Sequence, residues 1–472
     1  MCVRIPTGPQ ADAVGPPDAV GPPEGRADAG LHSVTNVSYR TPPGRAGTQH
    51  APQSRRAPHG WPHALVAVLA ALVVMTVVAA LGLWAAGAAD LPGGAFPSVV
   101  AAVVVMAVGG SVGLSGDAGG IAETDAGLSV LPLSVTLAGA LVIAAGFLRP
   151  LRHRAVADTR ELSGWAARIA LLWVLALVGL GLPARHRFTV SLGEGDAADI
   201  GDLLGASPEV GFETDVPLTL VFGLLWLAGV LAVALLVSRG APLPARLVRF
   251  QESVRPAAYA MVVLLLGYVA LGLVIGVVVA ATRGHAAETV AVLLLGIPNL
   301  VWLAFTLGLG ASWEGRVDGP FGLPMPRVLD DVLRTPKDST LSLRTLSEHD
   351  GRVWWLLVVA AVMVLGAAFV MAARSPARMP AWQHAVHMAV ALTLTVLAVC
   401  LLARVSAHAG LSLLGIGDLG GGLSGLVKLR PHVGTALFLA VAWGLVSGFI
   451  GGLLARRVHR RGEVGEEGPR QA

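Results

Sequence analysis

The chain has 472 residues, of which 54% are hydrophobic and only 14% are charged. Soluble globular domains carry about 25% charged residues, so this composition excludes an ordinary soluble enzyme and predicts a membrane protein. The net charge is +4 and arginine carries nearly all of the positive charge. Two cysteines, Cys2 and Cys400, are too few for a disulfide scaffold or a cysteine-based metal cluster.

Residues 1–60 are predicted to be a disordered cytoplasmic tail. They are rich in proline and glycine and contain a tandem repeat, because the six residues 12–17 recur unchanged as residues 18–23. Such a segment has too little apolar surface to offset the entropy of ordering the chain.

Residues 61–456 are predicted to form an all-α, polytopic transmembrane helical bundle of about 8–10 spans. A helix of about 20 apolar residues crosses the hydrocarbon core of a bilayer, and inside lipid the backbone must bond to itself. Hydrophilic loops at 185–215 and 311–352 interrupt the domain, and residues 457–472 form a basic, then acidic, cytoplasmic tail. The apolar runs of about this length are 64–88, 97–115, 128–148, 165–183, 216–237, 258–281, 287–309, 353–373, 384–403 and 435–454.

The orientation follows from arginine-rich segments, which stay on the cytoplasmic side of a membrane. Such segments precede the first run, occupy 149–160 and 239–255, and follow the last run. The loop 185–215 is mainly acidic and is predicted to be external. We therefore expect a multi-pass protein of the plasma membrane with both termini in the cytoplasm.

This orientation conflicts with the number of runs. Three runs separate two cytoplasmic segments at the start of the domain, and five separate two at its end, where even numbers are needed. Something in 97–148 and something in 384–434 is therefore predicted not to span simply. The glycine-rich stretches 109–117 and 415–425 are the expected re-entrant segments. The alternative is that arginine placement misleads for one loop.

A weak internal repeat relates these two stretches to a third at 201–205. Each precedes an apolar run with a threonine near its start: Thr136, Thr219 and Thr435. Repeats of this kind are typical of transporter folds. In a chain with 59 glycines, short matches also arise by chance.

Few polar residues are candidates for a site. Pro298 and Asn299 interrupt the seventh run and predict either a kink packed inside the bundle or a break that coordinates a ligand. Asp117 and Asp418 lie in the glycine-rich connections, and His384 and His387 are expected to form an interfacial pair. No Asp, Glu, Lys or Arg lies at the centre of any run, whereas ion-driven carriers usually keep such a group there.

Two runs carry glycines at four-residue spacing, which lets helix backbones approach closely in lipid. Packing within the chain and contact between two copies are both consistent with this spacing. The glycines are Gly272 and Gly276 in the sixth run and Gly444, Gly448 and Gly452 in the last.

Catalytic signals are poor. Gly109-Gly-Ser-Val-Gly113 matches the G-x-S-x-G pattern, but it lies between apolar runs and not at a strand-to-helix turn. H-E-x-x-H, Walker A and C-x-x-C motifs do not occur. The sequence therefore predicts no catalytic residues, no cofactor, no metal site and no nucleic-acid partner. The bilayer is the expected partner, a homo-oligomer is an open alternative, and whether a small-molecule ligand binds stays unknown from the sequence.

The apolar domain from about residue 61 to 461 resembles the streptophobe family of very hydrophobic actinobacterial membrane proteins. The most distinctive stretch runs from Gly308 to Arg316 and continues through Gly319-Pro-Phe-Gly-Leu-Pro-Met-Pro326. The resemblance implies a membrane location and a helical architecture, and it supplies no catalytic residue.

Two functions compete at this point. Glycine-rich breaks, the repeat and the Pro-Asn kink favour a carrier or a channel-like protein. The lack of charge at the centre of the runs favours a structural or regulatory membrane protein, which holds partners through its tail and the 311–352 loop.

Overall fold

The computed structural model describes residues 60–91, 94–118, 122–151, 159–184, 186–189, 209–238, 245–282, 284, 286–318, 332–333, 339–376, 379–413 and 425–457. The tail predicted for residues 1–60 lies outside this range except for Gly60. The tail predicted for 457–472 lies outside it except for Arg457. All the described residues belong to one compact unit.

The polytopic helical bundle predicted from the sequence is confirmed. Every one of the ten predicted runs contributes to a helix, and eight helices in the described part of the chain are long and apolar enough to cross a membrane. The chain is therefore a multi-pass membrane protein. Its α-helices are α1 (Trp61–Ala85), α2 (Phe96–Ala107), α3 (Leu133–Leu148), α4 (Thr159–Gly181), α6 (Val216–Val237), α7 (Ala245–Thr282), α8 (Ala286–Gly308), α10 (Leu343–His349), α11 (Trp355–Arg374), α12 (Ala381–Leu402) and α13 (Val433–Leu454).

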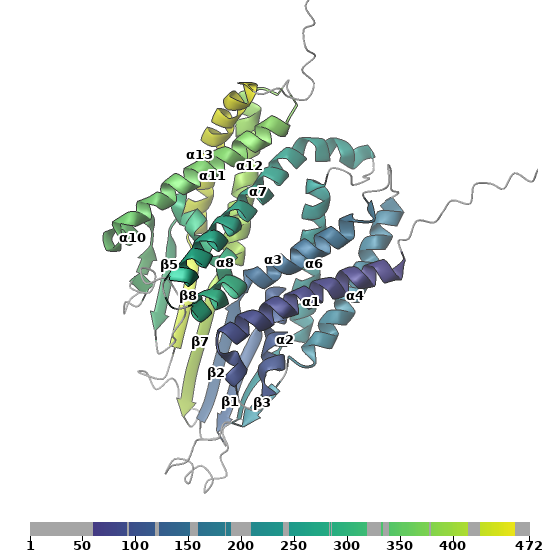
Figure 1. Ribbon diagram of the computed structural model, residues 1–472, viewed down its shortest axis with the longest axis vertical. Helices are drawn as coiled ribbons and strands as arrows, with labels where there is room; N and C mark the ends of the chain where they lie inside the picture. Colours follow the sequence, from purple (N-terminus) through teal and green to yellow (C-terminus); the bar gives the residue numbers. More distant parts are fainter. Residues whose placement is uncertain are drawn as a thin grey trace, which may run out of the picture. The chain divides into compact units, whose positions relative to one another are not determined.

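The bundle also carries an eight-stranded antiparallel sheet, which the sequence analysis did not foresee. Four strand pairs, each inserted between two helices, extend from one end of the bundle and join into one sheet with the order β3-β4-β1-β2-β7-β8-β5-β6 (Figure 1). We call this end of the bundle the sheet end. The strands are β1 (Val112–Ala118), β2 (Ala122–Val130), β3 (His186–Thr189), β4 (Glu209–Thr214), β5 (Trp313–Asp318), β6 (Ser339–Leu341), β7 (Val405–Leu413) and β8 (Gly425–Pro431).

The described chain is built from two halves with the same order of elements. In residues 61–237 and again in 245–457, two helices lead to a strand pair, two more helices lead to a second strand pair, and a fifth helix ends the half. The short helix α10 is an addition to the second half. The sheet repeats in the same way, because each half contributes its second strand pair followed by its first. Each half also has its own apolar core.

The two halves also share a helix ending. At the end of α2, the Gly110 amide donates to the Val105 carbonyl, and at the end of α8 the Ala311 amide donates to the Thr306 carbonyl. Both endings need a residue at positive φ, which Gly109 (96°) and Gly310 (94°) supply. A serine follows two residues later in each half, and a strand starts directly after it. The counterpart of the stretch 109–117 is therefore 310–318, and not 415–425 as predicted.

Helix contacts show the direction of each helix. α1 runs antiparallel to α3, because Gly146 packs on Ala67 and Gly139 on Met75. Since α3 follows directly from β2, α1 ends at the sheet end. α2 also leads into a strand, and at 12 residues it is about 18 Å long, too short to cross a bilayer. α2 therefore enters and leaves at the sheet end.

α8 stays near the sheet end, although its length and hydropathy suit a span. Its Leu293 carbonyl accepts a bond from Ser134 in the first turn of α3, which lies at the sheet end. Its last residue, Gly308, packs on Leu356 in the first turn of α11, next to the sheet. The helices that run from end to end are therefore α1, α3, α4 and α6 in the first half and α7, α11, α12 and α13 in the second. Among them, α3 reaches the arginine end at Arg149 although its 16 residues, about 24 Å, make it shorter than the others.

This arrangement resolves the parity conflict. The prediction of a segment that does not span within 97–148 agrees with α2. The described part of 384–434 does not contain the second such segment that was predicted there, since α12 and α13 pack as an antiparallel pair, and α8 is the second helix that does not cross. The stretch 109–117 is not re-entrant, since residues 112–118 are strand β1, whereas the prediction for 415–425 falls on residues that are not described except for Gly425.

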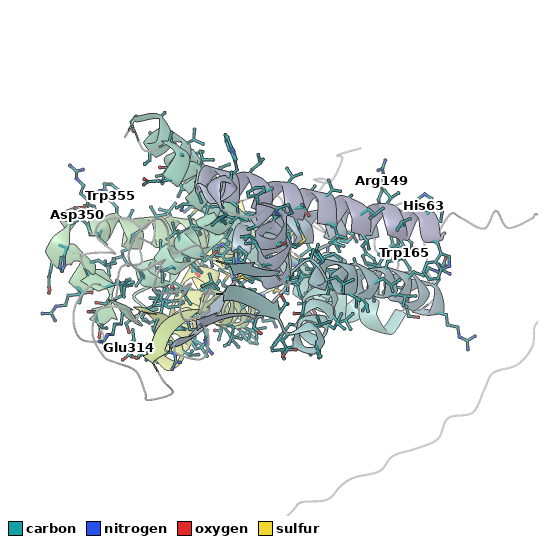
Figure 2. The ribbon with its side chains drawn as sticks, turned by 90° about the horizontal axis from the view of Figure 1, so that it is seen from below. His63, Arg149, Trp165, Glu314, Asp350 and Trp355 are labelled. Atoms are coloured by element: carbon teal, nitrogen blue, oxygen red, sulfur yellow. The ribbon has the colours of Figure 1, made fainter. Side chains whose placement is uncertain are left out.

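Tryptophans mark both ends of the bundle, as expected where side chains meet the membrane–water interface. In α1, Trp61 is 51% exposed and Trp84 is 66% exposed, and a helix of that length separates them by about 35 Å. Figure 2 shows His63 and Arg149 at one end and Asp350 and Trp355 at the other. We call the end that carries Arg149, Arg160, Arg374 and Arg456 the arginine end.

Candidate functional site: a polar joint between the halves

A polar joint connects α3 of the first half with α8 of the second. In an unbroken helix the Ile297 amide would donate to the Leu293 carbonyl. The Ser134 hydroxyl bonds to both of these groups, donating to the Leu293 carbonyl at 3.0 Å and accepting from the Ile297 amide at 3.2 Å. Pro298 follows and has no amide hydrogen to offer the preceding turn. A serine from the other half thus bonds to the turn of α8 that precedes Pro298.

Asn299 supplies the second part of the joint. Its Oδ1 accepts from the Leu133 amide at 3.1 Å, and its Nδ2 donates to the Leu131 carbonyl at 2.9 Å. Pro132 at the N-cap of α3 makes no side-chain capping bond, so Asn299 caps this helix from a neighbouring one. Both ends of the Asn299 amide therefore bond to the backbone that connects β2 with α3.

A third contact ties α2 to the same turn. The Thr136 hydroxyl donates to the Ala107 carbonyl at 2.6 Å, which is the last residue of α2. The first turn of α3 therefore holds the end of α2 from its own half and the middle of α8 from the other. Sequence reasoning singled out Pro298 and Asn299 but missed Ser134, because only the fold brings residues so far apart in the chain together.

The two histidines do not form a pair at the surface. His384 is fully buried in the first turn of α12 and packs on Gly452 of α13, whereas His387 is half-buried. Among the described residues, the buried polar and charged side chains are those of Thr136, Thr214, Thr219, Thr306, Ser375, His384 and Ser447.

The glycine faces are used for packing within the chain. A Cβ on Gly272 or Gly276 would meet Val301 or Leu293 of α8. In α13, a Cβ on Gly444 would meet Ala389, and one on Gly448 would come within 2.6 Å of the His384 carbonyl oxygen. These glycines let α7 approach α8 and let α12 approach α13 at backbone distance.

The sheet has one apolar and one polar face in its second half. Trp313, Gly315 and Val317 of β5 are buried, while Glu314 and Arg316 between them are half-buried. The buried face is covered by Val332, Leu333 and Leu346. On the polar face, Arg430 is in register with Glu314, and Lys428 with Arg316.

In the first half, the backbone register sets acidic residues in one row across three strands. Asp117 of β1 is in register with Glu123 of β2 on one side and with Glu209 of β4 on the other. Asp418 lies outside the described residues. A row of like charges across neighbouring strands is unfavourable for the sheet, so stability alone does not explain these residues.

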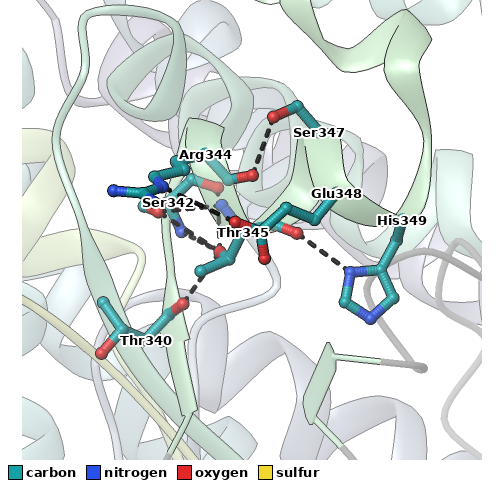
Figure 3. A network of polar contacts seen from close by, with 7 residues as sticks. All are labelled: Thr340, Ser342, Arg344, Thr345, Ser347, Glu348 and His349. Atoms are coloured by element: carbon teal, nitrogen blue, oxygen red, sulfur yellow. Dashed lines mark hydrogen bonds and ion pairs between the residues drawn. The ribbon is translucent and has the colours of Figure 1, made fainter.

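The helix α10 closes the β6 edge of the sheet. Thr345 donates its hydroxyl to the Thr340 carbonyl of β6 at 2.9 Å, and with Ser342 it forms a reciprocal capping box at the start of α10. Figure 3 shows these contacts, along with the exposed ion pair of Arg344 with Glu348 at 3.6 Å. The predicted hydrophilic loop 311–352 therefore contains the last two strands of the sheet order, β5 and β6, together with α10.

The geometry of the joint suits a fixed connection rather than chemistry. Its donors and acceptors bond to one another. Within the described ranges, no group of three or more His, Cys, Asp or Glu residues is placed to hold a metal ion. Comparisons with protein-family models, with curated proteins and with solved structures found no match.

Proposed function

We propose that this multi-pass membrane protein is a structural scaffold that holds an eight-stranded sheet at the outer face of the plasma membrane. The observation that carries the proposal is the ladder between β2 and β7, which joins the two halves through nine residue pairs, from Ala122 with Leu413 to Val130 with Val405. A carrier of the rocking type moves one repeat against the other around a central site. Opening at the sheet end would have to break this ladder.

The polar joint supports the same proposal. A ligand site in a broken helix needs polar groups that are available to the ligand. Here the Asn299 amide and the Ser134 hydroxyl bond to the backbone of the other half. They link the halves in the bundle, as the β2–β7 ladder links them in the sheet.

The orientation is part of the proposal. Arg149, Arg160, Arg255 and the end of α13 all lie at the arginine end, and α1 starts there. The positive-inside rule then favours cytoplasmic termini and an external sheet. Partners would meet the sheet outside and the tail 1–60 inside. Membership of the streptophobe family remains a prediction from the sequence.

A carrier is the second candidate, and one observation favours it. α8 contains Pro298 where the two tandem halves meet, which is where transporters built from repeats bind their substrates. The two candidates differ in motion. A carrier adopts two conformations in which the halves are separated by different distances at the arginine end, whereas a scaffold keeps one distance.

Spin labels at two sites measure this distance. Ser163 in α4 and Trp382 in α12 are exposed near the starts of their helices at the arginine end, one in each half. With Cys2 and Cys400 replaced, labels at Ser163→Cys and Trp382→Cys are expected to give one narrow distance distribution, unchanged by ion gradients or pH. A pair within the first half, at Ser163 and Trp61, controls for motion of the labels.

A second distance between the halves that appears only in the first pair would contradict the scaffold and support the carrier. The same single cysteines test the orientation independently. An impermeant thiol reagent is expected to leave Ser163→Cys and Trp382→Cys unlabelled in intact cells and to label them in opened cells. Labelling in intact cells would reverse the orientation without affecting the distance result.

A further inference from the structure

The helix α7 is too long to lie in the membrane over its whole length. Its 38 residues extend over about 57 Å, whereas the hydrocarbon core is about 30 Å thick. Pro256 lies inside the helix, near its start. In the ribbon of Figure 1, α7 bends as it joins the bundle. Residues 245–255 therefore form a separate stretch of helix before the span.

A contact with α11 fixes the depth of this stretch. The Arg374 guanidinium, at the end of α11, lies 3.6 Å from the centre of the Tyr259 ring. Arg374 belongs to the arginine end, so Tyr259 lies near the membrane surface there. Residues 245–255 precede Tyr259 and continue beyond that level, where a helix meets lipid headgroups.

The sequence of this stretch alternates in the manner of a surface helix. Leu247, Phe250 and Val254 recur at the three- and four-residue spacing of one helix face, and Arg246 and Arg249 stand between them in the sequence. Helices with an apolar stripe and flanking arginines lie in the membrane interface, where the stripe enters the acyl boundary and the cations meet headgroups.

We propose that residues 245–255 form an interfacial helix that binds anionic phospholipid headgroups at the arginine end. The arginines supply charge complementarity to lipid phosphates, and the kink at Pro256 lets the stretch leave the direction of the span. Basic residues near an anionic surface each strengthen binding by about five-fold, so the two arginines together contribute about 25-fold.

Hydrogen exchange of the full chain in lipid nanodiscs tests this inference. Amides of 245–255 are expected to exchange at least about five-fold more slowly in nanodiscs that contain phosphatidylglycerol than in those of phosphatidylcholine alone. The variant Arg246→Gln/Arg249→Gln should lose most of this difference. Arg344→Gln, at the sheet end, is the matched control and should keep it.

Exchange that is equal in both lipids would overturn the inference, as would a lipid dependence that survives in the double variant. Equal exchange would leave an acidic protein, rather than the membrane, as the partner of residues 245–255. A nanodisc offers the same lipids to both faces of the protein. The result is therefore independent of the orientation and of the scaffold proposed above.

Discussion

Asn299→Leu is expected to lower the free energy of unfolding by about 2–3 kcal/mol. Leucine has a similar volume but cannot bond, so the Leu133 amide and the Leu131 carbonyl would lose the partners they have at 3.1 and 2.9 Å. A buried backbone group left without a partner costs about 1–3 kcal/mol, and hydrogen bonds between membrane helices fall at the lower end of this range. The thermal midpoint of the purified protein in mild detergent measures the change.

Thr282→Val is the matched control for Asn299→Leu. The Thr282 hydroxyl bonds only within its own helix, to the Val278 carbonyl, and the residue is exposed. Its removal should leave the midpoint nearly unchanged. An Asn299→Leu protein as stable as the unmodified chain would show that Asn299 does not cap α3.

Gly448→Leu is expected to have the larger effect, about 3 kcal/mol or more. A Cβ at this position would lie 2.6 Å from the His384 carbonyl oxygen and 2.8 Å from the Ala385 Cα, both of which belong to the backbone of α12. A backbone cannot move aside as a side chain can, so α12 and α13 would have to separate. Detergent thermal stability and the yield of folded protein both report this loss.

Val446→Leu provides the comparison on the same helix, since Val446 is 57% exposed and a larger apolar side chain fits there. If the two leucine variants were equally stable, the glycine face of α13 would meet lipid rather than α12. A contact between two copies through this face would then return as the explanation of its spacing.

The ten helices could be predicted from the sequence because each gathers enough apolar residues to satisfy the bilayer by itself. The sequence could not show that α8 does not cross the bundle. α8 has the length and hydropathy of a crossing helix, and only its contacts at Ser134 and Leu356 show that it turns back. Hydropathy shows whether a segment can lie in a lipid environment. The direction of the helix depends on contacts with residues far away in the sequence.

The sheet was missed for a related reason. Its strands are short and rich in glycine, aspartate and serine, residues that are depleted in strands, and their partners lie up to 291 positions away, as for Ala122 and Leu413. A weak signal was present in β5, where apolar and charged residues alternate from Trp313 to Asp318. Asp117 and Asp418 stand out in the sequence as polar residues of glycine-rich connections, and the register shows that Asp117 belongs to a strand.

The candidate site was predictable in part. Pro298 and Asn299 stand out because a proline and an amide are costly in the middle of an apolar helix unless something receives them. The hydrogen-bond partners of Asn299 could not be predicted from the sequence, since Leu131 and Leu133 contribute only backbone atoms. Because every residue has backbone groups, the residue type does not reveal which of them accept or donate such a bond.

The shared sheet is tested most directly by a disulfide between the halves. Ser129 of β2 and Ser406 of β7 are in register, and paired residues of antiparallel strands lie about 4.5–5.5 Å apart at Cα, within the range of a disulfide. In a chain without Cys2 and Cys400, with a protease site placed in 239–244, Ser129→Cys/Ser406→Cys is expected to cross-link on mild oxidation. After cleavage the two halves should migrate together without reductant and separately with it. The control Ser129→Cys/Lys428→Cys spans two strand spacings, about 10 Å, and should not cross-link. Halves that separate without reductant in the first variant, or that cross-link equally in the control, would contradict a single sheet built from both.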